Sequence, residues 1–74
     1  MLSLDIHGLT IKEAKQAIDK HLEKIPSSIH EVPIIHGYNY GTALKDYVNK
    51  QYKHPRVIRR IKTMNPGETI LVLK

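Results

Sequence analysis

Leu4-Asp5-Ile6-His7-Gly8-Leu9-Thr10 is the stretch that decides the fold of this 74-residue chain. Apolar and polar residues alternate up to a His-Gly pair, which is typical of a half-buried strand that ends at the glycine. A partial copy, Ile34-Ile35-His36-Gly37, follows farther along the chain. If both strands are parallel members of one sheet, both His-Gly turns open at its carboxyl edge, where open α/β sheets place their ligands.

A helix is predicted directly after the first turn. Thr10 stands at the N-cap position and Glu13 follows three residues later, which together form a capping-box pattern. Behind it the apolar residues fall on one helical face, and Pro26 ends the helix because proline cannot continue the hydrogen-bond ladder. The apolar face consists of Ala14, Ala17, Ile18, Leu22 and Ile25.

The rest of the chain predicts a second strand, a second helix and two further strands. The second strand covers 32–35, and because Pro33 lacks an N–H we expect an edge position or a bulge there. The helix covers 43–51 and stops before His54-Pro55. A strand over 56–63, the turn Asn65-Pro66-Gly67 and a strand over 69–73 suggest a hairpin. Since the last strand is apolar on both faces, we place it inside the sheet. All these elements form a single domain over 1–74.

The size and composition of the chain limit the kinds of functional site that it can contain. A domain this small leaves no room for a large buried cavity, so any chemistry is expected at a rim or in a shallow groove. The chain has no cysteine, which excludes disulfides and thiolate metal sites. It shows neither a signal-peptide pattern nor an apolar run of membrane-spanning length. We therefore expect a cytoplasmic protein that is monomeric by default and does not enter membranes.

The positive charge is confined to the second half of the chain. Residues 1–37 carry a net charge of −1 and residues 38–74 a net charge of +6, within the total of +5. A one-sided basic field attracts polyanions, above all nucleic acid, although a solvated basic face that serves solubility is an alternative. The excess lies in a stretch without acidic residues that contains Lys50, Lys53, Arg56, Arg59, Arg60 and Lys62.

Three side chains at the predicted edge are candidates for chemistry. Asp5 and His7 lie two apart on one strand, and His36 ends its neighbour. As a cluster they would serve as a general base on a phosphodiester, or hold a divalent cation such as Mg²⁺ or Mn²⁺. The alternative is structural, with Asp5 accepting hydrogen bonds from the turn and each histidine fixing a loop. In the following loop, Tyr38 and Tyr40 are candidates for stacking on unpaired bases.

Two motifs resemble those of the Small MutS-Related (Smr) domain family. Leu4-Asp5-Ile6-His7-Gly8 resembles its leucine-aspartate-leucine-histidine-glycine motif, and His36-Gly37-x-x-x-Gly41 resembles its His-Gly-x-Gly-x-Gly signature. The resemblance implies an α+β two-layer sandwich similar to the carboxyl-terminal domain of translation initiation factor 3. In this α/β fold the sheet is mixed and has four strands in the order 1-2-4-3. Strand 4 is antiparallel, and two helices form the second layer.

The resemblance also implies a function. Members bind DNA or RNA and many are endonucleases, so Asp5 and His7 take the candidate catalytic role, and His36, Gly37 and Gly41 the substrate-loop role. We expect hydrolysis of RNA or of branched or single-stranded DNA. The predicted phosphate contacts are Lys53, Arg56, Arg59 and Arg60.

Two alternatives remain. One is a non-catalytic adaptor that docks on nucleic acid or the ribosome; Asn39 replaces the middle glycine of the second signature, which weakens the case for cleavage more than the case for binding. The other is a metal-dependent hydrolase of small phosphorylated molecules, which the small core disfavours.

Overall fold

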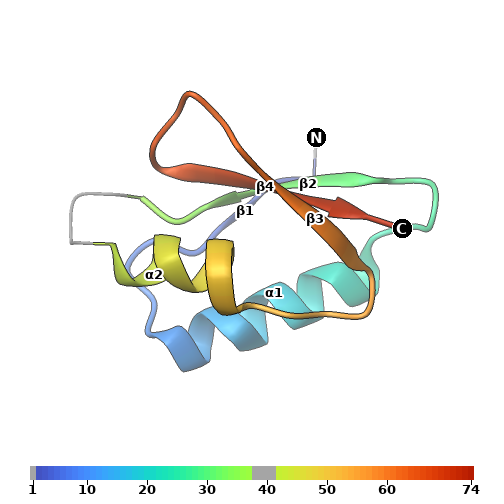
Figure 1. The fold of residues 1–74 in the computed structure, drawn as a ribbon. Helices are drawn as coiled ribbons and strands as arrows, with labels where there is room; N and C mark the ends of the chain where they lie inside the picture. The colour runs from blue at the N-terminus through green and yellow to red at the C-terminus, as the bar shows by residue number, and fades with distance from the viewer. Residues whose placement is uncertain (1, 38–41) are drawn as a thin grey trace.

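A computed structural model describes residues 2–37 and 42–74 as a four-stranded sheet with helices on one face. Figure 1 shows the helical layer below the sheet and the turn between the last two strands rising at one end. The elements in chain order are β1 (Leu4–Asp5), α1 (Ile11–Lys24), β2 (Glu31–Ile35), α2 (Ala43–Asp46), the π-helical segment η1 (Tyr47–Gln51), β3 (Val57–Lys62) and β4 (Glu68–Leu73).

The strand order is β1-β2-β4-β3, as predicted. β1 pairs with β2 in parallel, and β4 runs antiparallel to both β2 and β3. Both His-Gly turns therefore leave the sheet at the same edge, which confirms the expectation drawn from the repeated motif. The apolar run of β4 fits its position between two neighbouring strands.

The capping box in front of α1 is formed as predicted. The backbone N–H of Glu13 donates to Thr10 Oγ1 at 3.1 Å, and the N–H of Thr10 donates to Glu13 Oε1 at 2.9 Å. These bonds satisfy donors that a helix start otherwise leaves free, so the turn after Gly8 passes directly into α1. The inner face of α1 buries Ala14, Ile18 and Leu22.

The second helix differs from the prediction in its winding. It begins as the α-helix α2, but from Tyr47 to Gln51 it continues as a π-helix, in which Tyr52 N–H donates to Tyr47 O at 2.7 Å. The wider winding inserts a residue without breaking the helix, and such segments often occur at functional sites. It carries Asn49, whose contacts are described below.

Pro33 lies in an interior strand, which corrects the expectation of an edge or a bulge. His30 O accepts from Leu73 N–H and His36 N–H donates to Gly67 O, so even-numbered residues of this segment bond toward β4. Odd-numbered residues bond toward β1, as Ile35 O does with Ile6 N–H. Pro33 is odd-numbered, so its missing N–H removes no bond from the ladder with β4. It removes none from the ladder with β1 either, because β1 pairs only with Ile34 and Ile35.

A β-bulge changes the faces of β3. The register shifts between Val57 and Arg59, so that Val57 opposes Leu73 and Arg60 opposes Leu71. Residues opposite one another share a face of the sheet, and Leu71 and Leu73 are buried on the face that the helices cover. The bulge therefore places Val57 on the same face as Arg60, whereas simple alternation predicted opposite faces. Arg59 points to the face that the helices leave open.

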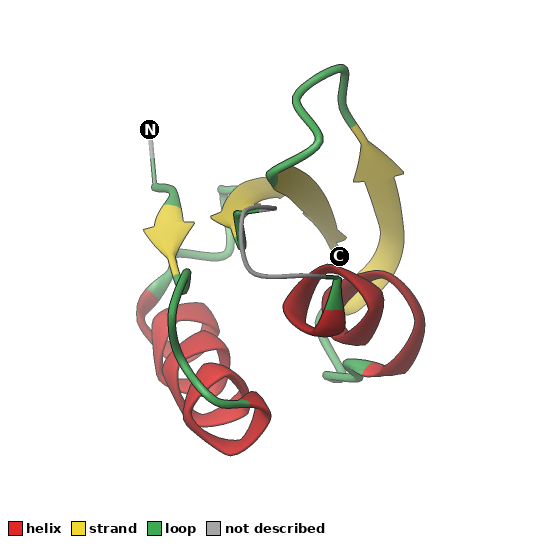
Figure 2. Ribbon diagram, turned by 90° about the vertical axis from the view of Figure 1, so that its left-hand side faces the viewer, coloured by secondary structure: helices red, strands yellow, loops and turns green. Residues whose placement is uncertain are grey.

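The core lies between the sheet and the two helices, which Figure 2 shows side by side beneath it. Its completely buried members come from both layers, and Tyr52 is the largest of them. Among the described residues no helix is long and apolar enough to span a membrane. The buried side chains include Ile6, Ile18, Leu22, Val32, Ile34, Val48, Tyr52 and Leu71.

Candidate functional site

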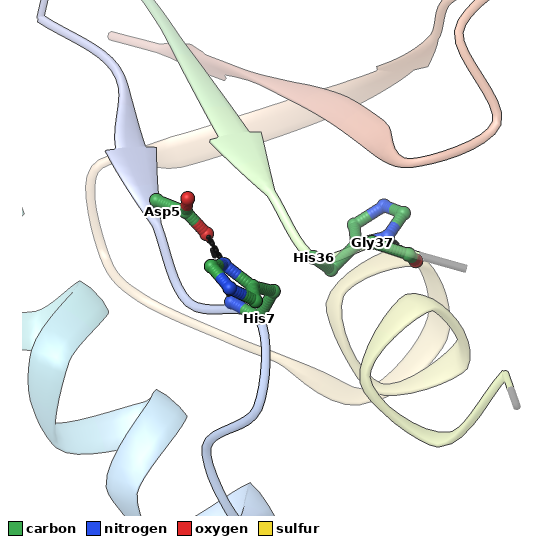
Figure 3. A network of polar contacts seen from close by, with 4 residues as sticks. All are labelled: Asp5, His7, His36 and Gly37. Atoms are coloured by element: carbon green, nitrogen blue, oxygen red, sulfur yellow. Dashed lines mark hydrogen bonds and ion pairs between the residues drawn. The ribbon is translucent and has the colours of Figure 1, made fainter. Parts of the chain in front are cut away.

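The two His-Gly turns lie against each other at the carboxyl edge of β1 and β2 (Figure 3). Gly8 has φ of 81° and Gly37 has φ of 75°, a backbone conformation that favours glycine. The Gly37 N–H donates to Gly67 O at 3.0 Å, which ties the second turn to the β3–β4 connection. A β-carbon at position 37 would lie 3.4 Å from Cβ of His7, which is van der Waals contact, so the two turns are direct neighbours.

Asp5 and His7 form a hydrogen-bonded pair on the first turn. Oδ1 of Asp5 lies 2.5 Å from Nδ1 of His7 and also accepts the His7 backbone N–H at 3.0 Å. The hydrogen bond from the His7 side chain, followed by the one from its backbone, lowers the pKa of Asp5. Both side chains are more than half exposed, at 54% and 64%. The pair is thus an ionised carboxylate that orients an imidazole at the surface.

His36 does not join this pair, which corrects the predicted Asp-His-His cluster. Its side chain is 4% exposed, with Nε2 2.9 Å from Thr69 Oγ1 and Nδ1 3.1 Å from Gly37 O. Asp5 pairs with Ile35 across the strands, so the next residue, His36, points to the opposite face of the sheet. His36 therefore fixes the second turn from the helical side, while Asp5 and His7 lie outside.

No group of three His, Cys, Asp or Glu side chains that could hold a metal ion occurs within residues 2–37 and 42–74. Asp5 remains a single exposed carboxylate. Mg²⁺ sites commonly use one or two protein carboxylates together with waters and substrate phosphates. The protein residue that would contact such a cation here is thus Asp5, with the remaining ligands supplied by water and substrate.

Two of the predicted phosphate contacts hold the protein together. Arg56 Nη1 donates to Leu22 O and Ile25 O, both at 2.8 Å, and Nη2 donates to Pro26 O at 3.3 Å. Its guanidinium thereby satisfies carbonyl groups that the end of α1 leaves free. Arg60 donates to the carbonyl of Tyr52, the residue that caps η1. These contacts give both arginines a structural role.

The other predicted phosphate contacts, Lys53 and Arg59, are exposed. Neither forms an ion pair or a side-chain hydrogen bond within the part of the chain that the structure describes. Of the loop residues proposed from the second signature, Gly37 lies at the turn, whereas Tyr38, Tyr40 and Gly41 lie outside the described residues.

Two residues at the site have no counterpart in the sequence-based predictions. Thr69 Oγ1 contacts His36 Nε2 and donates to Asn49 Oδ1 at 2.9 Å, so β2, β4 and η1 are linked by one row of polar groups. The signal that could have identified Thr69 is that it is the one polar residue of the predicted strand over 69–73. Asn49 carried no such signal, because it lies in a helix with other polar residues.

Comparison with known proteins agrees with the motifs and with the fold. The Smr domain family matches residues 4–69 of the chain. The crystal structure of the Smr domain of Thermus thermophilus MutS2 superimposes with a TM-score of 0.78 at 22% sequence identity, covering 97% of this chain and 96% of that one. No curated protein sequence matches the chain. Because the family matches residues 4–69, which is most of the chain, the chain belongs to the Smr domain family.

Proposed function

We propose that this domain binds nucleic acid across its paired His-Gly turns and hydrolyses a phosphodiester there, with Asp5 and His7 as the catalytic pair. The observation that carries the proposal is the 2.5 Å contact between Asp5 Oδ1 and His7 Nδ1 at an exposed edge. A carboxylate bonded to Nδ1 fixes the imidazole tautomer, so that Nε2 presents its lone pair outward. Nε2 of His7 has no hydrogen-bond partner among the described residues.

The proposed reaction is general-base hydrolysis. His7 Nε2 accepts a proton from a water molecule as the water oxygen attacks phosphorus. The bond between phosphorus and the leaving sugar oxygen breaks, and that oxygen receives a proton from solvent. Asp5 remains ionised and stabilises the imidazolium that forms, as its lowered pKa allows.

The substrate is proposed to reach the pair along the basic half of the chain. Arg59 extends from the open face of β3, and Lys53 precedes that strand; both are exposed. Arg56 and Arg60 are not part of the proposed footprint because their guanidinium groups already contact backbone carbonyls. Nucleic acid is favoured over a small phosphorylated molecule because these cations are spread over the surface and do not surround one pocket.

The test is a cleavage and binding assay on labelled single-stranded RNA, branched DNA and duplex DNA, with Mg²⁺, Mn²⁺ or EDTA. Asp5→Asn preserves the size of the side chain but removes the carboxylate charge, and His7→Ala removes the imidazole. We expect each variant to lose at least about a hundredfold in cleavage rate while it still binds the substrate.

His30→Ala is the matched control, since His30 is an exposed histidine at the opposite end of β2. Its cleavage rate should equal that of the unmodified protein. Binding without cleavage by the unmodified protein would overturn the catalytic role and make the domain an adaptor. Failure to bind any of the nucleic acids would overturn the proposal as a whole.

A further inference from the structure

A second feature lies beside the His-Gly turns, where α2 and η1 face the β3–β4 hairpin. Figure 1 shows this hairpin turn at the same end of the molecule as α2 and the carboxyl end of β2. A pocket of about 180 Å³ opens between them, and we call it the hairpin pocket. It is lined by Lys45, Asn49, Lys62, Met64, Glu68 and Thr69 together with the hairpin turn.

The hairpin pocket is linked to the second His-Gly turn through buried polar residues. Asn49 and Thr69 both line it and are hydrogen-bonded to each other at 2.9 Å. Thr69 also contacts Nε2 of His36, whose next residue, Gly37, lies against His7. The pocket and the Asp5–His7 pair thus lie on the two sides of the second turn, and a polymer has to pass over this turn to contact both.

The lining offers three kinds of contact. Lys45 and Lys62 come from different elements, and neither forms an ion pair within the described ranges, although Glu68 also lines the pocket. The Asn49 side chain supplies amide hydrogen-bonding groups, and Met64, which is fully exposed at the hairpin, supplies an apolar surface. Single-strand binders combine cations for the phosphates, polar groups for the base edge and an aromatic surface for its face, and Met64 takes the place of the aromatic residue here.

The size of the pocket limits what it can hold. Pockets for drug-sized ligands have volumes of roughly 300–1,000 Å³, so a volume of about 180 Å³ suits a smaller group. A base within a duplex cannot enter such a pocket, because it is stacked and paired.

We propose that the hairpin pocket receives one unpaired base of the nucleic acid that lies across the two His-Gly turns. This inference rests on the proposed function and extends it, because it makes the domain select single-stranded or locally unpaired substrate. Lys45 and Lys62 contact the phosphates on either side of the inserted nucleotide, Asn49 contacts the edge of its base, and Met64 packs on its face.

The test compares two oligonucleotides of equal length and charge, one with all its bases and one that is abasic at every position. Fluorescence anisotropy gives the affinity of each. We expect the unmodified protein to bind the base-bearing strand about tenfold more tightly than the abasic one. Met64→Ser and Asn49→Ala should reduce this ratio toward one, and circular dichroism should show that both variants are folded.

Ile58→Ala is the matched control, because Ile58 is an exposed apolar residue on β3 that does not line the pocket. It should retain the tenfold ratio. A ratio near one in the unmodified protein, or an unchanged ratio in both pocket variants, would overturn the pocket assignment while leaving nucleic-acid binding intact. If neither oligonucleotide binds, the proposed function fails together with this inference.

Discussion

Gly37 lies directly against His7: a β-carbon on the glycine would be 3.4 Å from the β-carbon of the histidine. The second turn is thus a direct neighbour of His7, one member of the proposed catalytic pair. The contact joins two residues from separate parts of the chain. Both turns end in glycine because both backbones have positive φ.

The first prediction tests this contact with valine at each of the two glycines. Both have positive φ, so each substitution should cost about 1–2 kcal/mol of unfolding free energy from backbone strain. A side chain at position 8 would meet nothing within 4 Å, whereas one at position 37 would press on His7. We expect Gly37→Val to be the more destabilising in urea unfolding. Equal losses for the two variants would show that the contact contributes nothing.

The second prediction separates a structural arginine from a binding one. Arg56→Ala removes hydrogen bonds to three carbonyl groups around the end of α1, so it should lower the free energy of unfolding by about 1–3 kcal/mol. Arg59→Ala should change it by no more than about 0.5 kcal/mol, because that side chain is exposed. Urea unfolding of both variants gives the comparison.

The same two variants should rank in the opposite order when nucleic-acid affinity is measured. Arg59→Ala is expected to weaken binding across sequences and to reduce the slope of log affinity against log salt by about 1. Arg56→Ala should leave that slope unchanged at temperatures where it is folded. A lower slope for Arg56→Ala would mean that its guanidinium also contacts phosphate.

The complete strand order was implied by the family resemblance, and two signals in the sequence agreed with it. The final strand is apolar on both faces, which favoured an interior position, and the paired His-Gly motifs predicted a shared edge if the first two strands are parallel. The start of α1 could be predicted to the residue, since Thr10 and Glu13 determine a capping box. Each of these signals depends on residues close together in the chain.

The parts of the site that could not be predicted depend on contacts between distant segments. Charge alone does not distinguish an arginine that binds phosphate from Arg56, which contacts carbonyls at the end of α1. The side to which His36 points follows only from the register of β2 against β1. The bulge at β3 has no sequence signal such as a glycine, and it moved Val57 to the face of Arg60.

The third prediction concerns the polar row beneath the second turn. Thr69→Val keeps the shape of the side chain but removes the hydroxyl that joins His36 Nε2 to Asn49. Because Thr69 is buried, the two partners would be left unpaired, at a cost of about 1–3 kcal/mol in thermal or urea unfolding. Thr42→Val is the control: the Thr42 hydroxyl donates to Asp46 Oδ2 at 3.0 Å, but at the surface, where water replaces the lost bond, so this variant should cost less. A neutral Thr69→Val would show that the row does not stabilise the turn.

The fourth prediction concerns the pH dependence of stability that arises from Asp19, whose carboxylate contacts the buried Tyr52. The hydroxyl of Tyr52 donates to Asp19 Oδ1 at 2.7 Å, and Lys15 donates to Oδ2 at 2.8 Å. Burial opposes ionisation of Asp19, but these hydrogen bonds outweigh it and the pKa of the carboxyl lies below its usual value. The same contact adds to burial in raising the pKa of Tyr52.

A lowered pKa in the folded state fixes the sign of the effect. The contribution of Asp19 to stability is complete above its unfolded pKa of about 3.9, and it is lost as pH falls from there through the lower folded value. Asp19→Asn should therefore lower the free energy of unfolding by about 1–2 kcal/mol at pH 7, and the difference from the unmodified protein should narrow below about pH 4. Urea unfolding across this range measures it, with Glu23→Gln on the exposed face of α1 as the control. A difference between Asp19→Asn and the unmodified protein that stays constant down to pH 2 would contradict the assignment, because the charged form of Asp19 would then contribute nothing.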